Sequence, residues 1–310
     1  MLLTLEQYAD EYLPQRGLPW PAAPKVEPKK AKPALVQLTV KAVMWTAYGT
    51  LLAVPKGELL FEPEIDFVYD VALDKLIQEF KMWQSMSRKP GAPAAYMKEL
   101  YKKAYDTVRL TNPEIVSEKI WDDVYKKLLQ KDYVYDVSTY GPPAEYVKKI
   151  AYFFHASIQG CGAYAGAADA IRAVADKGKL NGLLADGQCF TPAQIHKACR
   201  EQDPSFDVNQ YFPLNLRLLS AEKRAKKPND AFFKLAVDAL KSRGIAPHDA
   251  LHVGSNLLRD IAPAKKLGFR TALFVGDKAS LVATSEQVKD PAMRPDVLLT
   301  ELPQILDVIG

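Results

Sequence analysis

The 310-residue chain is long enough to bury a large core, and 41 Lys and Arg against 37 Asp and Glu leave a net charge of only +4. That charge is too small to indicate a nucleic-acid partner, and three cysteines without a Cys-x-x-Cys spacing indicate neither a disulfide framework nor a zinc site. No apolar run approaches the roughly 18 residues of a membrane span, and the first residues lack the pattern of a secretory signal. We therefore expect a soluble, cytoplasmic protein.

Residues 1–37 are predicted to form a Pro-rich arm outside any sheet. Leu5 to Leu13 has the spacing of one short amphipathic helix, and the prolines between positions 14 and 33 then favour an extended conformation. The arm is locally basic and contains Trp20. Two interpretations remain open: the arm lies on its own domain, or it docks a protein partner through Trp20.

An apolar, β-rich run from Val40 to Trp45 reads as a buried strand that ends in a small-residue turn at Gly49. About a hundred residues of helical periodicity follow. Apolar side chains recur at intervals of three and four over 67–83, 96–108 and 115–129, and a fourth helix begins near residue 144. The Tyr and Lys residues interleaved there are interpreted as core and solvated face, and not as a nucleic-acid surface.

From about residue 164 the pattern changes to alternating strands and helices. The predicted strands are 180–184, 216–219, 250–253, 271–275 and 295–299, and the predicted helices are 168–176, 192–200, 230–242, 258–267 and 302–309. Alternation of this kind implies right-handed crossovers. It predicts an α/β protein with a doubly wound parallel sheet.

Short motifs at the strand ends resemble those of the haloacid dehalogenase-like (HAD) hydrolase superfamily. Ala47-Tyr-Gly-Thr-Leu51 matches the first motif of the dehalogenase branch, Ser220 to Asp230 resembles the third, and Val253-Gly-Ser-Asn-Leu-Leu-Arg-Asp260 resembles the fourth. The resemblance is to the dehalogenase and phosphoglycolate phosphatase type, which carries a helical cap. It implies a HAD-type doubly wound parallel sheet (a Rossmann-like core) with an inserted α-helical cap domain.

The implied division places the α/β core in residues 38–54 and 156–310 and the cap in residues 55–155. Site residues follow from the motifs. The resemblance assigns Thr46, Ser255 and Asp260 to the catalytic positions and Tyr48, Ala185, Lys227 and Asn256 to the substrate-binding positions.

Three of these positions lack the residue that the family's chemistry uses. Thr46 stands where the nucleophilic Asp is expected, Ala185 where a Ser or Thr is expected, and Ser255 where an Asp is expected. A Thr hydroxyl without an adjacent base is a poor nucleophile, and a single remaining carboxylate offers little to Mg²⁺. We therefore predict a divergent member without the family's nucleophile, with no cofactor and with weak or absent Mg²⁺ binding.

Lys227 and Asp260 have two interpretations: an internal ion pair, or a lysine that contacts an anion. Three functions remain open. The favoured one is a pseudoenzyme, a HAD-fold protein that binds a small anionic ligand or a protein partner without catalysis. The alternative is a hydrolase, either a phosphatase or a 2-haloacid dehalogenase-like enzyme, with a rewired active site. The third is a structural subunit that uses the arm and the cap as contact surfaces. Neither nucleic acid nor a membrane is predicted as a partner.

Overall fold

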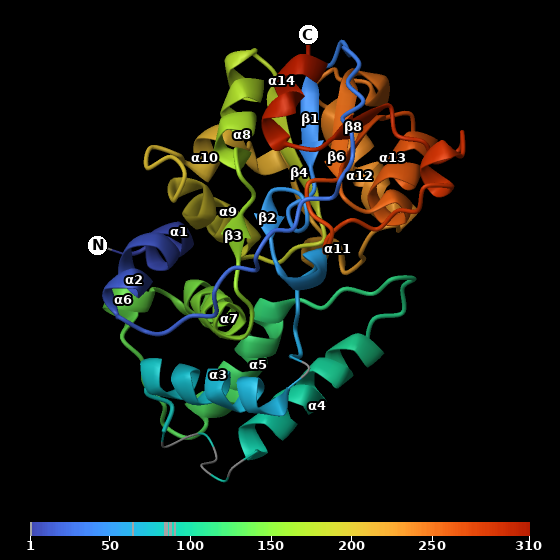
Figure 1. The fold of residues 1–310 in the computed structure, drawn as a ribbon. Helices are drawn as coiled ribbons and strands as arrows, with labels where there is room; N and C mark the ends of the chain where they lie inside the picture. Colours follow the sequence, from blue (N-terminus) through green and yellow to red (C-terminus); the bar gives the residue numbers. More distant parts are fainter. Residues whose placement is uncertain (1, 64, 84–85, 87–88, 90) are drawn as a thin grey trace.

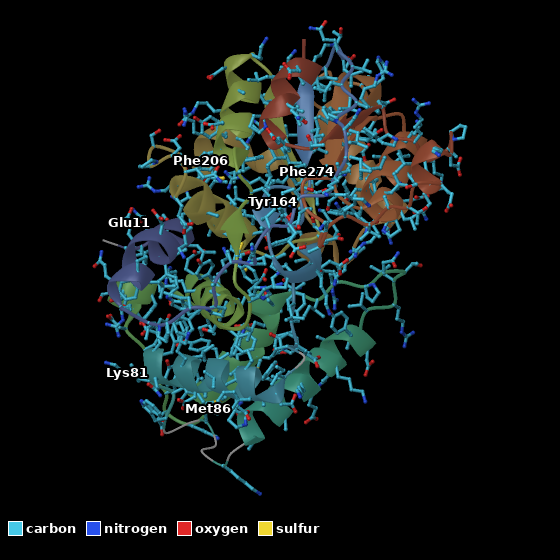
Figure 2. The ribbon with its side chains drawn as sticks, in the orientation of Figure 1. Glu11, Lys81, Met86, Tyr164, Phe206 and Phe274 are labelled. Atoms are coloured by element: carbon cyan, nitrogen blue, oxygen red, sulfur yellow. The ribbon has the colours of Figure 1, made fainter. Side chains whose placement is uncertain are left out.

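The computed structural model describes residues 2–310 apart from 64, 84–85, 87–88 and 90, and Figure 1 shows two layers stacked along the long axis of the molecule. One layer is an α/β sandwich that holds the C-terminus, and the other consists of helices. Figure 2 shows side chains filling both layers, with Tyr164 and Phe274 inside the α/β layer and Lys81 toward the outer end of the helical layer. No helix in the described residues is long and apolar enough to cross a membrane.

Within the described residues, one sheet has six strands in the order β5-β4-β1-β6-β7-β8, and every neighbouring pair is parallel. The strands are β1 (Ala42–Trp45), β4 (Leu180–Ala185), β5 (Arg217–Leu219), β6 (Ala250–Gly254), β7 (Arg270–Phe274) and β8 (Val297–Leu299). This confirms the predicted α/β class. The strand order reverses between β1 and β6, and in such sheets ligands bind outside the carboxyl ends of the strands at that point.

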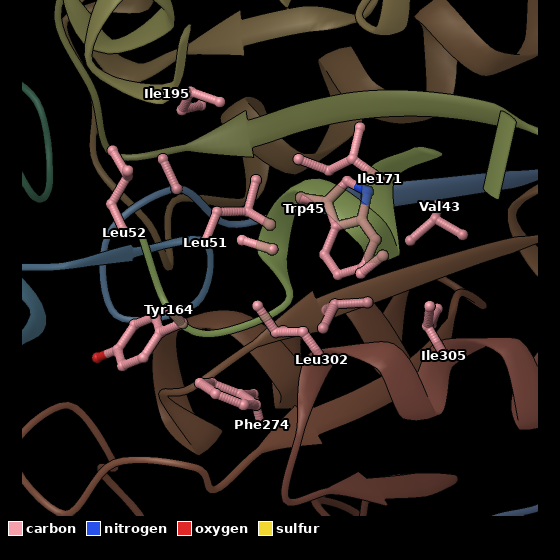
Figure 3. Close-up of a cluster of buried hydrophobic side chains, with 14 of the residues drawn as sticks. Val43, Trp45, Leu51, Leu52, Tyr164, Ile171, Ile195, Phe274, Leu302 and Ile305 are labelled. Atoms are coloured by element: carbon pink, nitrogen blue, oxygen red, sulfur yellow. The ribbon is translucent and has the colours of Figure 1, made fainter. Parts of the chain in front are cut away.

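Strand β1 is buried on both faces, which is why its sequence is a continuous apolar run. Val43 and Trp45 point into the core beneath the helices α8 (Ala167–Asp176) and α14 (Ile305–Val308), and Figure 3 shows Trp45 packed there beside Ile171. The Trp45 indole N–H donates to Asn181 Oδ1 at 2.8 Å, so its polar atom is satisfied.

The opposite face of β1 carries Ala42 and Met44, which pack against Phe232 and Phe233 of α12 (Asp230–Lys241). The remaining helices of the α/β layer are α9 (Thr191–Arg200), α10 (Val208–Tyr211), α11 (Ser220–Lys223) and α13 (Ala262–Lys266). Helices on both faces complete the doubly wound arrangement.

The helical layer is inserted between two short strands, β2 (Leu52–Ala53) and β3 (Gly162–Ala163), which pair antiparallel. Its helices are α3 (Asp66–Glu79), α4 (Ala92–Asp106), α5 (Ser117–Leu129), α6 (Val137–Tyr140) and α7 (Pro143–Ile158). They enclose a second hydrophobic core that contains Trp121, Tyr146 and Phe153. The sequence analysis missed β2 and β3, because two-residue strands are too short to show a periodicity.

The N-terminal segment connects the two layers. It is one continuous helical stretch made of α1 (Leu5–Gln7), the π-helical turn Tyr8–Tyr12 and α2 (Leu13–Gln15). The fully buried ring of Tyr8 lies edge-on to Tyr140 and Tyr152 of the helical layer. On the other side, Asp10 Oδ2 lies 2.7 Å from Arg200 Nε at the end of α9.

The Pro-rich arm that follows lies on the surface of its own chain. The ring of Trp20 meets Phe153 edge-on at 5.2 Å, and the backbone N–H of Lys278 donates to Glu27 O at 2.8 Å. Residues 1–37 were expected to lie wholly outside the sheet, and this is wrong for one residue. Ala34 forms an antiparallel bridge with Leu298 of the edge strand β8, because that edge offers unpaired backbone groups.

We predict that Tyr8→Ala lowers the free energy of unfolding by about 3–5 kcal/mol, because it leaves a cavity where an aromatic ring joins two layers. Tyr8→Phe is the matched control. The Tyr8 hydroxyl is buried and has no hydrogen-bond partner among the described residues, so its removal should not destabilise the protein. Urea denaturation followed by circular dichroism measures both variants. Equal stability of Tyr8→Ala and Tyr8→Phe would contradict this packing.

Candidate functional site

A small crevice of about 50 Å³ lies at the carboxyl ends of β1 and β6, where loops enter the helical layer. This volume holds a few water molecules or one small ion. Of the described residues that line the crevice, four are carboxylates and four are cations: Glu58, Glu114, Asp186 and Asp260, and Lys56, Lys226, Lys227 and Arg259. The walls therefore carry charges of both signs in equal number.

Lys227 is at the centre of the polar contacts in this crevice. Its side chain is almost fully buried, and its Nζ donates to Thr46 Oγ1 at 2.9 Å and to the Asp260 carboxylate. Asp260 Oδ2 accepts a second hydrogen bond from the Asn256 N–H at 2.9 Å. Burial on its own would raise the pKa of Asp260, but the charge and hydrogen bond of Lys227, together with the Asn256 N–H and the nearby His252, hold that pKa below the usual value of 3.8.

The backbone around Thr46 brings it to the sheet edge. Its N–H donates to Val253 O at 2.9 Å, which continues the pairing of β1 with β6 by one residue. Gly49 then turns the chain with a φ of +76°, and a Cβ at this position would lie 2.6 Å from Ser255 Oγ. Only glycine allows this close approach without strain, so the two strand ends stay in contact.

Two further contacts place Lys227 and Asp260. The Lys227 N–H donates to Asp186 Oδ1 at 2.8 Å, which fixes the loop after α11 on the end of β4. Asn256 Oδ1 accepts from the Leu258 and Arg259 N–H groups at 3.1 and 3.0 Å and caps the π-helical turn Leu257–Ile261. That turn directs Asp260 into the crevice.

The structure brings together six of the seven residues assigned from the sequence. Thr46, Tyr48, Lys227, Ser255, Asn256 and Asp260 line the crevice. Ala185 is not among the described lining residues. It is fully buried in the core, and Asp186 lines the crevice in its place.

The Tyr48 hydroxyl is hydrogen-bonded to side chains of α9. It donates to Gln194 Oε1 at 2.6 Å and lies 2.8 Å from Thr191 Oγ1. Burial raises the pKa of Tyr48 well above its ordinary value of 10.0, so the phenol stays neutral at physiological pH. Tyr48 therefore supplies shape to the crevice but no charge.

Other residues of the crevice were missed by the sequence analysis. Arg259 forms ion pairs with Asp186 from the end of β4 and with Glu58 from the chain that leads into the helical layer. Its position inside the fourth motif was a usable signal, but its partners lie 73 and 201 residues away in the sequence. Glu114 comes from the loop between α4 and α5, where no motif or periodicity marks it.

The strand order, the inserted helical layer and the grouping of motif residues at one sheet edge define a capped α/β protein of the HAD type. A HAD-hydrolase-like family model matches residues 224–305. Over the rest of the chain, the likeness to haloacid dehalogenase-like proteins is one of fold.

The chain is similar to a curated phosphatase in sequence and to a dehalogenase and a phosphatase in structure. A glyceraldehyde 3-phosphate phosphatase of Pyrococcus furiosus is 31% identical over 134 residues, which are 43% of this chain and 48% of that protein. The chain thus spans about half the length of this curated relative. A 2-haloacid dehalogenase structure from Pseudomonas syringae pv. tomato has a TM-score of 0.50 at 16% identity, covering 86% of this chain and 96% of that one. A HAD phosphatase structure from Thermococcus onnurineus has a TM-score of 0.43 at 17% identity over 86% and 96%.

The superfamily implies Mg²⁺ at this edge, and the residues present do not fit it. Both oxygens of Asp260 already accept from Lys227 and Asn256, and both oxygens of Asp186 accept from Lys227 and Arg259. Mg²⁺ requires oxygen ligands in a nearly octahedral arrangement, and here cationic side chains and backbone N–H groups occupy these oxygens. In the described part of the chain, no group of three or more His, Cys, Asp or Glu side chains could hold a metal ion.

We predict that Asp260→Asn lowers the free energy of unfolding by about 3–5 kcal/mol at neutral pH, because it leaves the buried Lys227 ammonium without a counter-charge. The folded-state pKa of Asp260 is lowered, so its stabilisation is fully present above the usual value of 3.8 and is lost as the pH falls through the lower folded-state value. The difference between wild type and Asp260→Asn should shrink accordingly in denaturant titrations at decreasing pH.

The control for this variant is Asp249→Asn. Asp249 pairs with Lys41 at 2.8 Å in a solvent-exposed position, where water screens the charges, so its loss should change stability little. If Asp260→Asn lowered the free energy of unfolding as little as this control does, the Lys227–Asp260 pair would not be a buried ion pair.

Proposed function

We propose that the crevice binds a small anion and does so without the covalent Asp chemistry of its superfamily. One observation carries this proposal: Lys227 Nζ donates to Thr46 Oγ1 at 2.9 Å. Because that oxygen accepts from the ammonium, the hydroxyl proton of Thr46 remains available as a donor to a ligand. An ammonium and a hydroxyl that both donate hydrogen bonds favour the binding of an anion. They do not favour attack by the Thr46 oxygen on an electrophilic substrate.

The neighbouring groups favour binding over nucleophilic catalysis. Lys227 is the ion-pair partner of the Asp260 carboxylate, and an ammonium cannot accept the Thr46 proton. His252 is the nearest histidine along the motif. Burial lowers its pKa to about 3, and its ring packs against Phe233 on the α12 side of the sheet. It is therefore not positioned as a base for Thr46.

A rewired hydrolase is the second candidate, and the same hydrogen bond favours it. A hydroxyl 2.9 Å from a lysine has the geometry of a nucleophile and its base, as in Ser-Lys hydrolases. In this candidate Lys227 must first lose its proton despite Asp260. The phosphatase and dehalogenase names of the relatives give the substrate classes to test: small phosphate monoesters and 2-haloacids.

For anion binding, we predict that acetate, phosphate or sulfate at constant ionic strength raises the melting temperature of the wild type by a site-specific increment that Thr46→Val abolishes. Thr50→Val is the matched control, since Thr50 is fully buried, lies outside the crevice and has no hydrogen-bond partner for its Oγ1 among the described residues. It should retain the full increment. Phosphate and sulfate also stabilise proteins non-specifically, and the comparison of the two variants subtracts this effect.

The result that overturns anion binding is an equal increment in Thr46→Val and Thr50→Val for every anion. In that case the anion acts elsewhere or non-specifically.

For catalysis, we predict no turnover of an aryl phosphate or of 2-chloropropionate above background, with or without Mg²⁺. Loss of the covalent nucleophile in a comparable hydrolase costs on the order of 10⁶ in rate, about 8 kcal/mol of activation free energy. Turnover that Thr46→Val abolishes and Thr50→Val retains would instead establish the rewired hydrolase.

A further inference from the structure

The helical layer contributes a carboxylate to the crevice through Glu114. This side chain is 1% exposed, and its oxygens accept from Ser220 Oγ at 2.8 Å and from the Ile115 N–H at 3.0 Å. Lys226 Nζ lies 3.5 Å from the same carboxylate. A buried carboxylate with two hydrogen-bond donors and an ion-pair partner has a fixed position and a fixed direction.

The loop that carries Glu114 is attached to the α/β layer by its backbone. The Glu114 N–H donates to Arg224 O at 3.0 Å, and the Lys226 N–H donates to Asn112 O at 2.8 Å. Asn229 Nδ2 also donates to Thr111 O at 3.0 Å. Glu114 therefore stays beside the crevice as long as the two layers are in contact.

The charges in the crevice are already matched. Lys227 contacts Asp260, Arg259 contacts Asp186 and Glu58, and Lys226 contacts Glu114. Counting the described lining residues, four carboxylates oppose four cations, so the net charge is zero when Glu114 is ionised and +1 when it is neutral. When Glu114 is neutral, the crevice charge of +1 balances a ligand with one negative charge. A ligand with two negative charges is not fully balanced whether Glu114 is neutral or ionised.

We propose that Glu114 makes the crevice selective for singly charged small anions over doubly charged ones. This inference rests on the proposed anion binding and adds to it the charge class of the ligand. Glu114 acts here as a specificity-determining residue: its carboxylate opposes the second charge of a dianion at close range, in a site where little water screens the repulsion.

The same geometry makes the selectivity depend on pH. Burial raises the pKa of Glu114 to about 7, against the opposing effects of Lys226 and of the Ser220 hydrogen bond. Asp186 at the end of β4, Tyr105 on α4 and Tyr48 after β1 also face it. Lowering the pH through about 7 therefore removes one negative charge from the crevice, and affinity for anions should rise, most of all for dianions.

The test compares methanesulfonate, a tetrahedral monoanion, with sulfate, a dianion of similar shape; both keep their charge from roughly pH 5.5 to 8.5, a range that spans the Glu114 titration. Isothermal titration of the wild type should show tighter binding of methanesulfonate, with a preference that falls by about tenfold or more from the high to the low pH. Glu114→Gln should bind sulfate about tenfold more tightly at the high pH and should lose the pH dependence of the preference.

The matched control is Glu145→Gln, which makes the same change in net charge on α7. Glu145 Oε1 lies 2.9 Å from Lys148 Nζ, and neither residue is among the described residues that line the crevice, so this variant should behave as the wild type. If both anions bind Glu114→Gln with the preference and pH dependence of the wild type, the role of Glu114 is refuted while anion binding stands. If neither anion binds the wild type, both proposals fail. Should Glu114→Gln not fold, the pH dependence of the preference in the wild type decides: a constant preference refutes the role of Glu114.

Discussion

A buried ammonium group must be paired, and this requirement organises the carboxyl edge of the sheet. Lys227 satisfies it through Asp260 and Thr46, two residues that reach it from β1 and from the turn after β6. Asp260 in turn receives the Asn256 N–H, and the Lys227 backbone binds Asp186 at the end of β4. Lys227 thus connects the ends of three strands through its ammonium and its backbone N–H, across as many as 181 residues of sequence.

The same requirement limits the chemistry of this edge. Each carboxylate that would otherwise serve a metal ion or a proton transfer is engaged by a cation or by a backbone donor. A buried ion pair is stable only if its remaining hydrogen-bonding capacity is also satisfied. The polar groups here satisfy one another, whereas a metal-dependent active site keeps ligand positions open for its ion.

The sequence predicted the fold and most of the crevice because these depend on local patterns. Apolar runs locate the strands, and in a parallel sheet the carboxyl ends of β1 and β6 meet, so Thr46 and Ser255 had to lie together. Ala185 was misplaced because β4 extends one residue further than predicted. Side chains alternate along a strand, so that residue faces the core and Asp186 is the first to face the crevice. Glu58 and Glu114 could not be predicted, because each is positioned by a partner far away in the sequence, and a long-range pair has no local signature.

The N-terminal segment changes how the two layers can move. An inserted layer joined only through β2 and β3 could swing about that pair of strands, as on a hinge with one axis. Here the N-terminal segment and the loop that carries Glu114 cross the same boundary as well. The chain after the N-terminal helix lies so close to Gly160 that a Cβ added at Gly160 would lie 1.8 Å from Ala22 O. These contacts restrict rotation of the helical layer about β2 and β3. A swing away from the sheet edge would have to break the contacts of the N-terminal segment with one of the two layers and the backbone hydrogen bond from Glu114 to Arg224 as well.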